Sequence, residues 1–89
     1  MIYYYKTSYG TFIIKPHKIK TDHFSLYIDE KQLCTYKDAE SAAEDVFTQS
    51  TGFPMWDNFD GRRYELPEDL SWWEQAEIFT EVSTDIYRG

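Results

Sequence analysis

Hydrophobic and polar positions alternate along the first third of the chain, as they do in strands that bury one face. The segments Ile2–Lys6 and Thr11–Lys15 are rich in Tyr, Ile and Phe, and a polar turn separates them. Alternation resumes over His23–Asp29, and Leu33–Tyr36 follows after a second polar turn. β-Branched and aromatic residues that alternate with polar ones favour strands. The pattern therefore predicts two β-hairpins.

The apolar spacing changes to a helical period after residue 38. Asp38 is a favourable N-terminal cap, because its carboxylate accepts hydrogen bonds from the free amides of the first turn. The apolar stripe consists of Ala39, Ala42, Ala43, Val46 and Phe47. Gly52 suits the left-handed conformation that ends many helices, and Pro54 prevents the helix from resuming. We therefore expect one main helix over about 38–51.

The last third of the chain begins with a helix-start signal and ends with an ambiguous pattern. In the run from Leu66 to Asp69, proline suits the first helical position and two acids suit the positive end of the helix dipole. We predict a second, C-terminal helix from Pro67 to about Ala76. Residues 78–88 fit both a helix and an alternating strand, and that choice stays open.

These elements predict an α+β fold, with a small antiparallel sheet of about four strands in two hairpins. The main helix and the C-terminal helix would pack against this sheet and bury its apolar face. We expect residues 1–89 to form a single domain. Aromatic residues make up 19% of the chain and would supply much of the small core.

Charge is divided unevenly along the chain. Residues 1–37 contain six lysines and three acids, a balance of +3, and residues 38–89 contain thirteen acids and three arginines, a balance of −10; the sum is −7. An acidic surface repels nucleic acid and attracts basic surfaces. The C-terminal part is therefore expected to meet a basic protein partner.

The sequence shows no membrane span, signal peptide or disulfide framework. No stretch approaches the about 20 apolar residues of a membrane helix. The start, MIYYYKT, lacks the basic residues and apolar run of a signal peptide. Cys34 is the single cysteine, and its place in a predicted strand indicates a small buried side chain. We expect a cytoplasmic protein that is not associated with membranes.

The stretch STGFPMWDNFDG, residues 50–61, resembles a binding site more than any other. In a structural interpretation, Gly52 caps the helix, Trp56 closes the edge of the core, and Asp and Asn side chains form turns. In a functional interpretation, Asp57 and Asp60 form an acidic tip beside an exposed ring and contact a protein. The turn preferences of these residues favour the structural interpretation.

A second candidate contact lies at Trp72 and Trp73. These residues are about 100° apart around a helix, so both rings cannot point into one core. Either both lie at the helix–sheet junction, or one is exposed among acidic residues, where tryptophan is common at interface hot spots. The residues expected to bind a partner are Trp56, Asp57, Asp60, Glu68, Asp69, Trp72, Trp73, Glu74 and Glu77.

The tyrosines of the first hairpin suggest an alternative function. Tyr3, Tyr5 and Tyr9 are expected to share one sheet face, with Lys6, Lys15, Lys18 and Lys20 nearby. Aromatic rings interleaved with lysines can stack on bases and neutralise phosphates. The chain is acidic and has no RNP-type motif, so binding of single-stranded nucleic acid is the alternative and not the leading prediction.

Catalytic and metal-binding patterns are missing from the sequence. His17 and His23 could share a metal across a loop, but zinc normally takes three or four protein ligands and no others converge there. Cys34 has no evident base beside it. The chain contains no G-x-S-x-G, P-loop, G-x-G-x-x-G or H-E-x-x-H pattern. We therefore expect no enzymatic activity, no cofactor and no metal.

The run from Phe24 to Asp57 contains a series of motifs that resembles a known arrangement. Leu33-x-x-Tyr36 leads into Ala42-Ala43-x-Asp45-Val46 and then into Thr51-Gly52-x-x-x-Trp56-Asp57. This arrangement is similar to a group of short, mostly uncharacterised bacterial proteins. The resemblance implies a bacterial or mobile-element origin and a reusable small scaffold, and it implies no activity or site residue.

The leading prediction is a non-catalytic, acidic protein-interaction module. Its C-terminal part would mask a basic surface on a partner protein, in the manner of an inhibitor or an immunity-type protein. Clustered carboxylates can steer such an association. A homodimer also stays open, because strand edges and surface aromatic residues favour self-association.

Overall fold

The computed structural model of the protein describes residues 1–20, 22–60 and 66–76. The strands are β1 (Ile2–Thr7), β2 (Gly10–Pro16), β3 (Phe24–Ile28), β4 (Lys31–Tyr36) and β5 (Glu74–Ala76). The helices are α1 (Ala39–Phe47), α2 (Pro54–Asp57) and the single 3₁₀ turn η2 (Leu70–Trp72).

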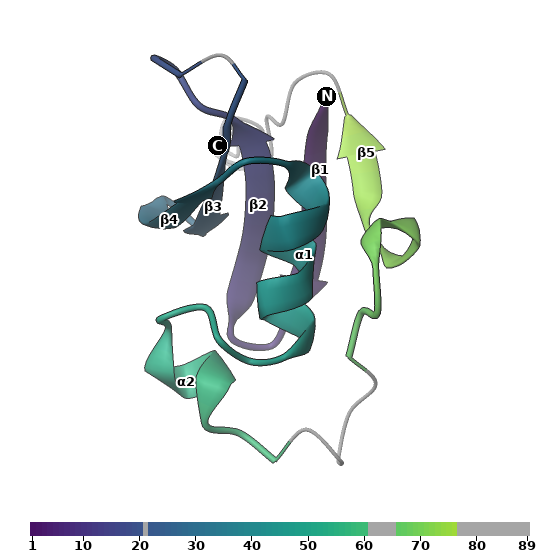
Figure 1. Ribbon diagram of the computed structural model, residues 1–89. Helices are drawn as coiled ribbons and strands as arrows, with labels where there is room; N and C mark the ends of the chain where they lie inside the picture. The colour runs from purple at the N-terminus through teal and green to yellow at the C-terminus, as the bar shows by residue number, and fades with distance from the viewer. Residues whose placement is uncertain (21, 61–65, 77–89) are drawn as a thin grey trace, which may run out of the picture.

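The strands form one antiparallel sheet in the order β4-β3-β2-β1-β5 (Figure 1). Both predicted hairpins are confirmed, since β1 pairs with β2 and β3 pairs with β4. A fifth strand was not expected: β5 pairs with Ile2–Tyr4 along the outer edge of β1. The described fold is therefore α+β as predicted, with one strand more than the hydrophobic pattern indicated.

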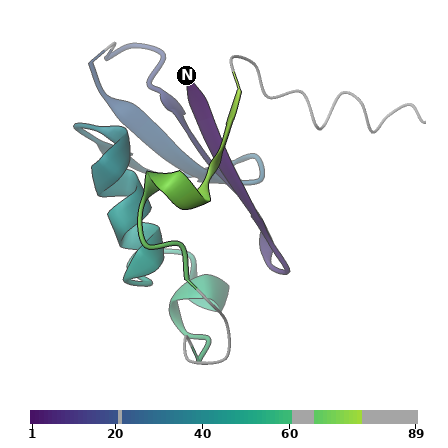
Figure 2. The same ribbon diagram turned by 90° about the vertical axis from the view of Figure 1, so that its right-hand side faces the viewer.

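Helix α1 covers one face of the sheet, and the core lies between them (Figures 1 and 2). Four residues of the predicted stripe are buried there, whereas Phe47 at the end of the helix is 37% exposed. The fully buried cluster consists of Phe12, Ile14, Leu26, Ile28, Ala39, Ala42, Ala43, Val46, Trp56 and Trp73. Three of the four buried helix positions are alanines, so α1 can approach the sheet closely.

Helix α1 begins where predicted and ends earlier. The Asp38 carboxylate accepts a hydrogen bond of 2.7 Å from the Ser41 amide, and bonding to Ser41 holds the pKa of the Asp38 carboxyl below its ordinary value. The helix stops at Thr48 because Gln49 takes the left-handed conformation, with φ of 59°. The predicted end near residue 51 is therefore wrong, and Gln49, not Gly52, follows the helix cap.

The predicted helix from Pro67 to about Ala76 is wrong. Asp69 accepts a hydrogen bond of 2.9 Å from the Ser71 amide, and only the single turn η2 follows. The chain then extends as β5 and satisfies the edge of β1, which a helix could not do. This path also places Trp73 in the core, 5.6 Å between ring centroids from Tyr5.

Candidate functional site

The loop after α1 is held together by polar groups that turn inward. The Asp57 carboxylate accepts hydrogen bonds from the Thr51 amide at 2.9 Å, the Thr51 hydroxyl at 2.8 Å and the Gly52 amide at 2.7 Å. The Gln49 side-chain amide donates to the carbonyl oxygens of Trp56 at 2.8 Å and Phe59 at 3.0 Å. We call residues 49–59 the capped loop. The contacts of Asp57 in it are therefore structural.

Trp56 is the centre of the capped loop and is not an exposed anchor. Its side chain is 3% exposed, and its indole N–H donates to the Val46 carbonyl oxygen at 2.9 Å. Its ring meets Phe12 at 5.0 Å and Phe59 at 4.7 Å between centroids, both edge to face. The prediction that Trp56 contacts a partner is corrected, because the one-turn helix α2 directs its ring into the core.

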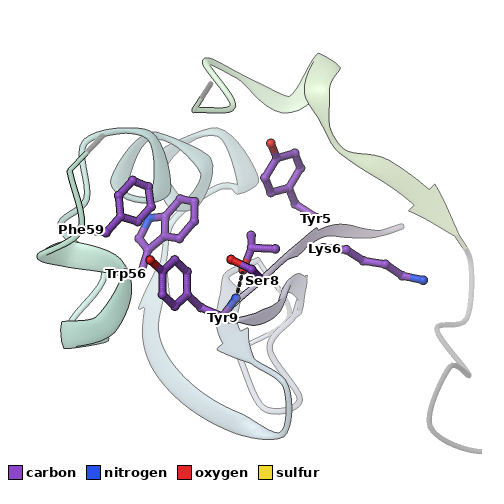
Figure 3. Close-up of a pocket in the computed structure, with 7 residues that line it drawn as sticks. Tyr5, Lys6, Ser8, Tyr9, Trp56 and Phe59 are labelled. Carbon is purple, nitrogen blue, oxygen red and sulfur yellow. Dashed lines mark hydrogen bonds between the residues drawn. The ribbon is translucent and has the colours of Figure 1, made fainter. Parts of the chain in front are cut away.

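A recess of about 280 Å³ lies between the β1–β2 turn and the capped loop (Figure 3). Its lining consists of Tyr5, Lys6, Thr7, Ser8, Tyr9, Trp56 and Phe59. The Tyr9 ring is stacked on Phe59, with centroids 5.6 Å apart. In Figure 3 the Lys6 side chain runs away from these rings. We call this hollow the aromatic recess; its surface is mainly rings and hydroxyls.

A second recess adjoins the first along β1. It also measures about 280 Å³, and its lining consists of Tyr4, Tyr5, Lys6, Trp72 and Glu74. The Tyr4 hydroxyl donates to a Glu74 carboxylate oxygen at 3.4 Å. Because Tyr5 and Lys6 line both hollows, the two recesses are neighbours on one side of the molecule. We call the second hollow the Trp72 recess.

The described residues of the C-terminal part place several acids beside an exposed indole. Trp72 is 40% exposed, and Glu68, Asp69 and Glu74 are exposed around it in sequence. Residues 66–76 contain no lysine or arginine. The hydrogen bonds from Ser71 hold the pKa of the Asp69 carboxyl below its ordinary value, so this group stays charged. We call Glu68, Asp69, Trp72 and Glu74 the acidic tryptophan surface.

The predicted contact residues Trp73, Asp60 and Glu77 do not belong to the acidic tryptophan surface as the structure describes it. Trp73 is 5% exposed, so its role is in the core and the prediction that it contacts a partner is corrected. Its indole N–H is buried, and none of the described residues accepts a hydrogen bond from it. Asp60 is exposed at the end of the capped loop, and Glu77 lies outside the described residues. Trp72 is therefore exposed and Trp73 is buried, which agrees with the interpretation that one of these two rings is exposed among acidic residues.

Tyr3, Tyr5 and Tyr9 share one face as predicted, but that face is covered and does not form a surface for bases. All three pack against the core cluster on the side of α1. The opposite face carries a row across the sheet from the half-buried Tyr4 through the buried Ile13 to the half-buried Tyr27. The Lys15 ammonium lies 4.6 Å from the centroid of the Tyr27 ring. The residues Ile2–Tyr5 are all apolar or aromatic, so alternation could not decide which of them face the helix.

The reactive side chains of the described residues lie in separate parts of the fold. Within residues 1–20, 22–60 and 66–76, no three His, Cys, Asp or Glu side chains are placed to hold a metal. His17 accepts backbone hydrogen bonds from Ile19 and Lys20, and His23 contacts Asp22. Cys34 is exposed on the edge strand β4, and the expectation of a buried thiol is wrong. A bulge in the pairing of β3 with β4 lies next to it.

A small enzyme built around a pocket beside residues 50–61 was a third possibility from the sequence, but the sequence did not predict the walls of either recess. Their walls come from the β1–β2 turn, the capped loop and η2, and these are brought together only by the sheet and by β5. The one available signal was the spacing of Trp56 and Phe59, three residues apart after a helix-starting proline. That spacing places two rings on one side of a short helix.

No family model, curated protein or solved structure matches this chain. The resemblance of residues 24–57 to short bacterial proteins therefore stays a prediction. Among the described residues, every helix is too short or too polar to pass through a membrane.

Proposed function

We propose that this protein is a non-catalytic interaction module that binds a basic surface of a partner protein through the acidic tryptophan surface. The observation that supports this proposal is the 40% exposed indole of Trp72 beside Glu68, Asp69 and Glu74, in a segment free of basic residues. Of the remaining acidic candidates, Asp57 accepts hydrogen bonds inside the capped loop, Asp60 is exposed, and Glu77 lies outside the described residues. Binding would mask the partner's basic surface, as an inhibitor or immunity-type protein does.

The chemistry of this surface suits arginine and lysine side chains. A guanidinium or ammonium group over an indole face gains about 0.5–1 kcal/mol at an exposed site. Carboxylates steer a basic partner toward the site, and salt weakens this steering because charges are screened over about 10 Å at 0.1 M. The Trp72 recess is lined by one carboxylate, Glu74, and one ammonium, Lys6, and the exposed acids Glu68 and Asp69 precede Trp72 in sequence.

The test is affinity capture from a bacterial lysate with charge-reversed variants. The variant Glu68→Lys/Glu74→Lys changes the acidic tryptophan surface, and Glu40→Lys/Glu44→Lys changes two exposed acids of α1 by the same net charge. We expect a basic protein that is captured by the wild type, is released by high salt, is lost by the first variant and is kept by the second. Equal capture by both variants would contradict the proposal.

A second candidate function is binding of single-stranded nucleic acid by the sheet face opposite α1. It is favoured by the Tyr4–Ile13–Tyr27 row and by the Lys15 ammonium over Tyr27. Such faces stack bases on aromatic rings and neutralise phosphates with lysines. Titration with short oligonucleotides at low salt tests it. Binding that Tyr27→Ala and Lys15→Gln both weaken would support this candidate, and no binding at micromolar protein would reject it.

A further inference from the structure

We propose that the aromatic recess and the Trp72 recess together accept the basic loop of a second copy of this chain. The basic loop is defined as residues His17–Lys20. This inference rests on the proposed function, because it uses the acidic tryptophan surface. It names one basic partner of that surface, which is the protein itself.

The basic loop presents an apolar side chain on an ordered backbone. Ile19 is 83% exposed, more than any other large apolar residue described. The amides of Ile19 and Lys20 each donate to His17 Nδ1 at 3.1 Å, and the His17 amide donates to the His23 carbonyl oxygen at 2.8 Å. Single exposed apolar residues are common. Here the loop is fixed by its own hydrogen bonds, so Ile19 is held outward at little further cost in conformational entropy.

The shape of the loop suits the aromatic recess, and its charge is complementary to that of Glu74, while Lys6 also lines both recesses. Lys18 and Lys20 are exposed on either side of Ile19, in the lysine-rich part of the chain. The aromatic recess is lined by four rings and has room for a branched aliphatic side chain. Glu74 lines the adjoining recess, within reach of a long lysine side chain on the same loop. Ile19 therefore fits the aromatic recess while a neighbouring lysine meets Glu74.

The topology requires that the loop come from another copy. The aromatic recess lies at the β1–β2 turn, and the basic loop follows the opposite end of β2 (Figure 1). Strand β2 has seven residues, which separate its ends by roughly 20 Å. One copy cannot fold its loop into its own recess. Two copies in an antiparallel arrangement can each insert a loop into the other, which closes a dimer with two equal contacts.

Sedimentation equilibrium over a range of protein concentrations tests the inference. We expect the wild type to dimerise and high salt to weaken the dimer. Ile19→Ser removes the inserted side chain, and Ser8→Phe fills the aromatic recess from its rim; each should raise the dimer Kd by about tenfold or more. Met55→Ser is the matched control, because Met55 is 60% exposed on α2 and lies in neither recess. It should leave the Kd unchanged.

Mixing the two defective variants gives a sharper test. Ile19→Ser keeps an intact recess and Ser8→Phe keeps an intact loop, so the mixture should form a heterodimer through one remaining contact. A wild-type protein that stays monomeric, or variants that dimerise as well as the wild type, would overturn the inference. Absence of the heterodimer would overturn it too. None of these outcomes affects the capture of a basic protein by the acidic tryptophan surface, which tests the proposed function separately.

Discussion

The capped loop and the segment 66–76 contain the same kinds of side chain and use them in opposite ways. In the capped loop, the Asp57 carboxylate receives three hydrogen bonds from Thr51 and Gly52, and the Trp56 N–H is bonded to a carbonyl oxygen. In the segment 66–76, the acids are exposed, Trp72 is 40% exposed, and the buried Trp73 N–H has no acceptor within the part of the chain that the structure describes. The first region completes the fold, and the second presents its chemistry to solvent.

This difference shows which structural features distinguish a carboxylate that stabilises a turn from one that is available to a partner. A part-buried carboxylate whose two oxygens both accept hydrogen bonds from its own loop has little left to offer a partner, because its bonds are directed inward. Residue types alone do not separate the two cases, since both regions combine tryptophan with carboxylates. What separates them is burial and the use of the carboxylate oxygens: Asp57 accepts through both oxygens, whereas the exposed Asp69 accepts from Ser71 through Oδ1.

The largest effect on stability is expected from Trp56→Ala. Removing a buried tryptophan leaves a cavity and costs about 3–5 kcal/mol of unfolding free energy. Trp72→Ala should cost no more than about 1 kcal/mol, because surface substitutions usually have small effects. Chemical denaturation of both variants measures the difference. Equal losses would mean that Trp72 supports the fold and that the two regions are not distinct.

The next largest effect is expected from Asp57→Ala. It removes hydrogen bonds to a charged group and leaves the Thr51 and Gly52 amides unpaired, at a cost of about 2–3 kcal/mol. Glu68→Ala, on the acidic tryptophan surface, should change stability by less than about 0.5 kcal/mol. Urea denaturation at neutral pH compares them. If Asp57→Ala is as stable as Glu68→Ala, the capped loop does not depend on Asp57.

A smaller effect distinguishes the two buried tryptophans. Trp56→Phe removes one of the donors to the Val46 carbonyl oxygen, which keeps the Gln49 amide, whereas Trp73→Phe removes a donor that has no acceptor among the described residues. Trp56→Phe should therefore be the more destabilising substitution by about 1 kcal/mol, the typical net value of one hydrogen bond. Thermal unfolding of both variants tests this order, and the reverse order would contradict the assigned hydrogen bonds.

The smallest effect is a change in alkaline stability at Tyr36. Its hydroxyl donates to the Asp45 carboxylate at 2.7 Å, and burial together with this bond raises the pKa of the Tyr36 phenol above its ordinary value of 10.0. A raised folded-state pKa contributes stability that is complete below about pH 10 and is lost as the pH rises further. Tyr36→Phe should show a smaller decline in unfolding free energy above pH 10. An identical decline would mean that this phenol is not coupled to folding.

The parts of the fold that were predictable depend on local patterns. The two hairpins follow from alternation and turns, and α1 follows from its cap and its alanine-rich stripe. β5 was not predictable, because three residues carry little pattern and their partner is the distant N-terminal strand. The predicted helix from Pro67 was based on a proline and two acids, which are common in the first turn of a helix. Pairing with the edge of β1 and burial of Trp73 outweigh this local helix propensity.

The candidate site was predictable only in part. Glu68, Asp69, Trp72 and Glu74 were named from their residue types, and the structure keeps them on the exposed side of one segment. Trp56 and Trp73 were misjudged as contacts, because the direction of each ring depends on the turn that precedes it. The recesses need three segments that are far apart in sequence, so no local pattern could reveal them.

The most direct test is an NMR titration of the ¹⁵N-labelled protein with an arginine-rich peptide at low salt. The three tryptophan indole N–H signals report separately on the capped loop, the core and the exposed surface. We predict that the Trp72 indole and the Glu74 amide shift most, that the Trp56 indole stays in place, and that added salt reverses the shifts. Shifts centred on the capped loop or on the Tyr27 face, with the Trp72 signal unmoved, would contradict the proposed binding surface.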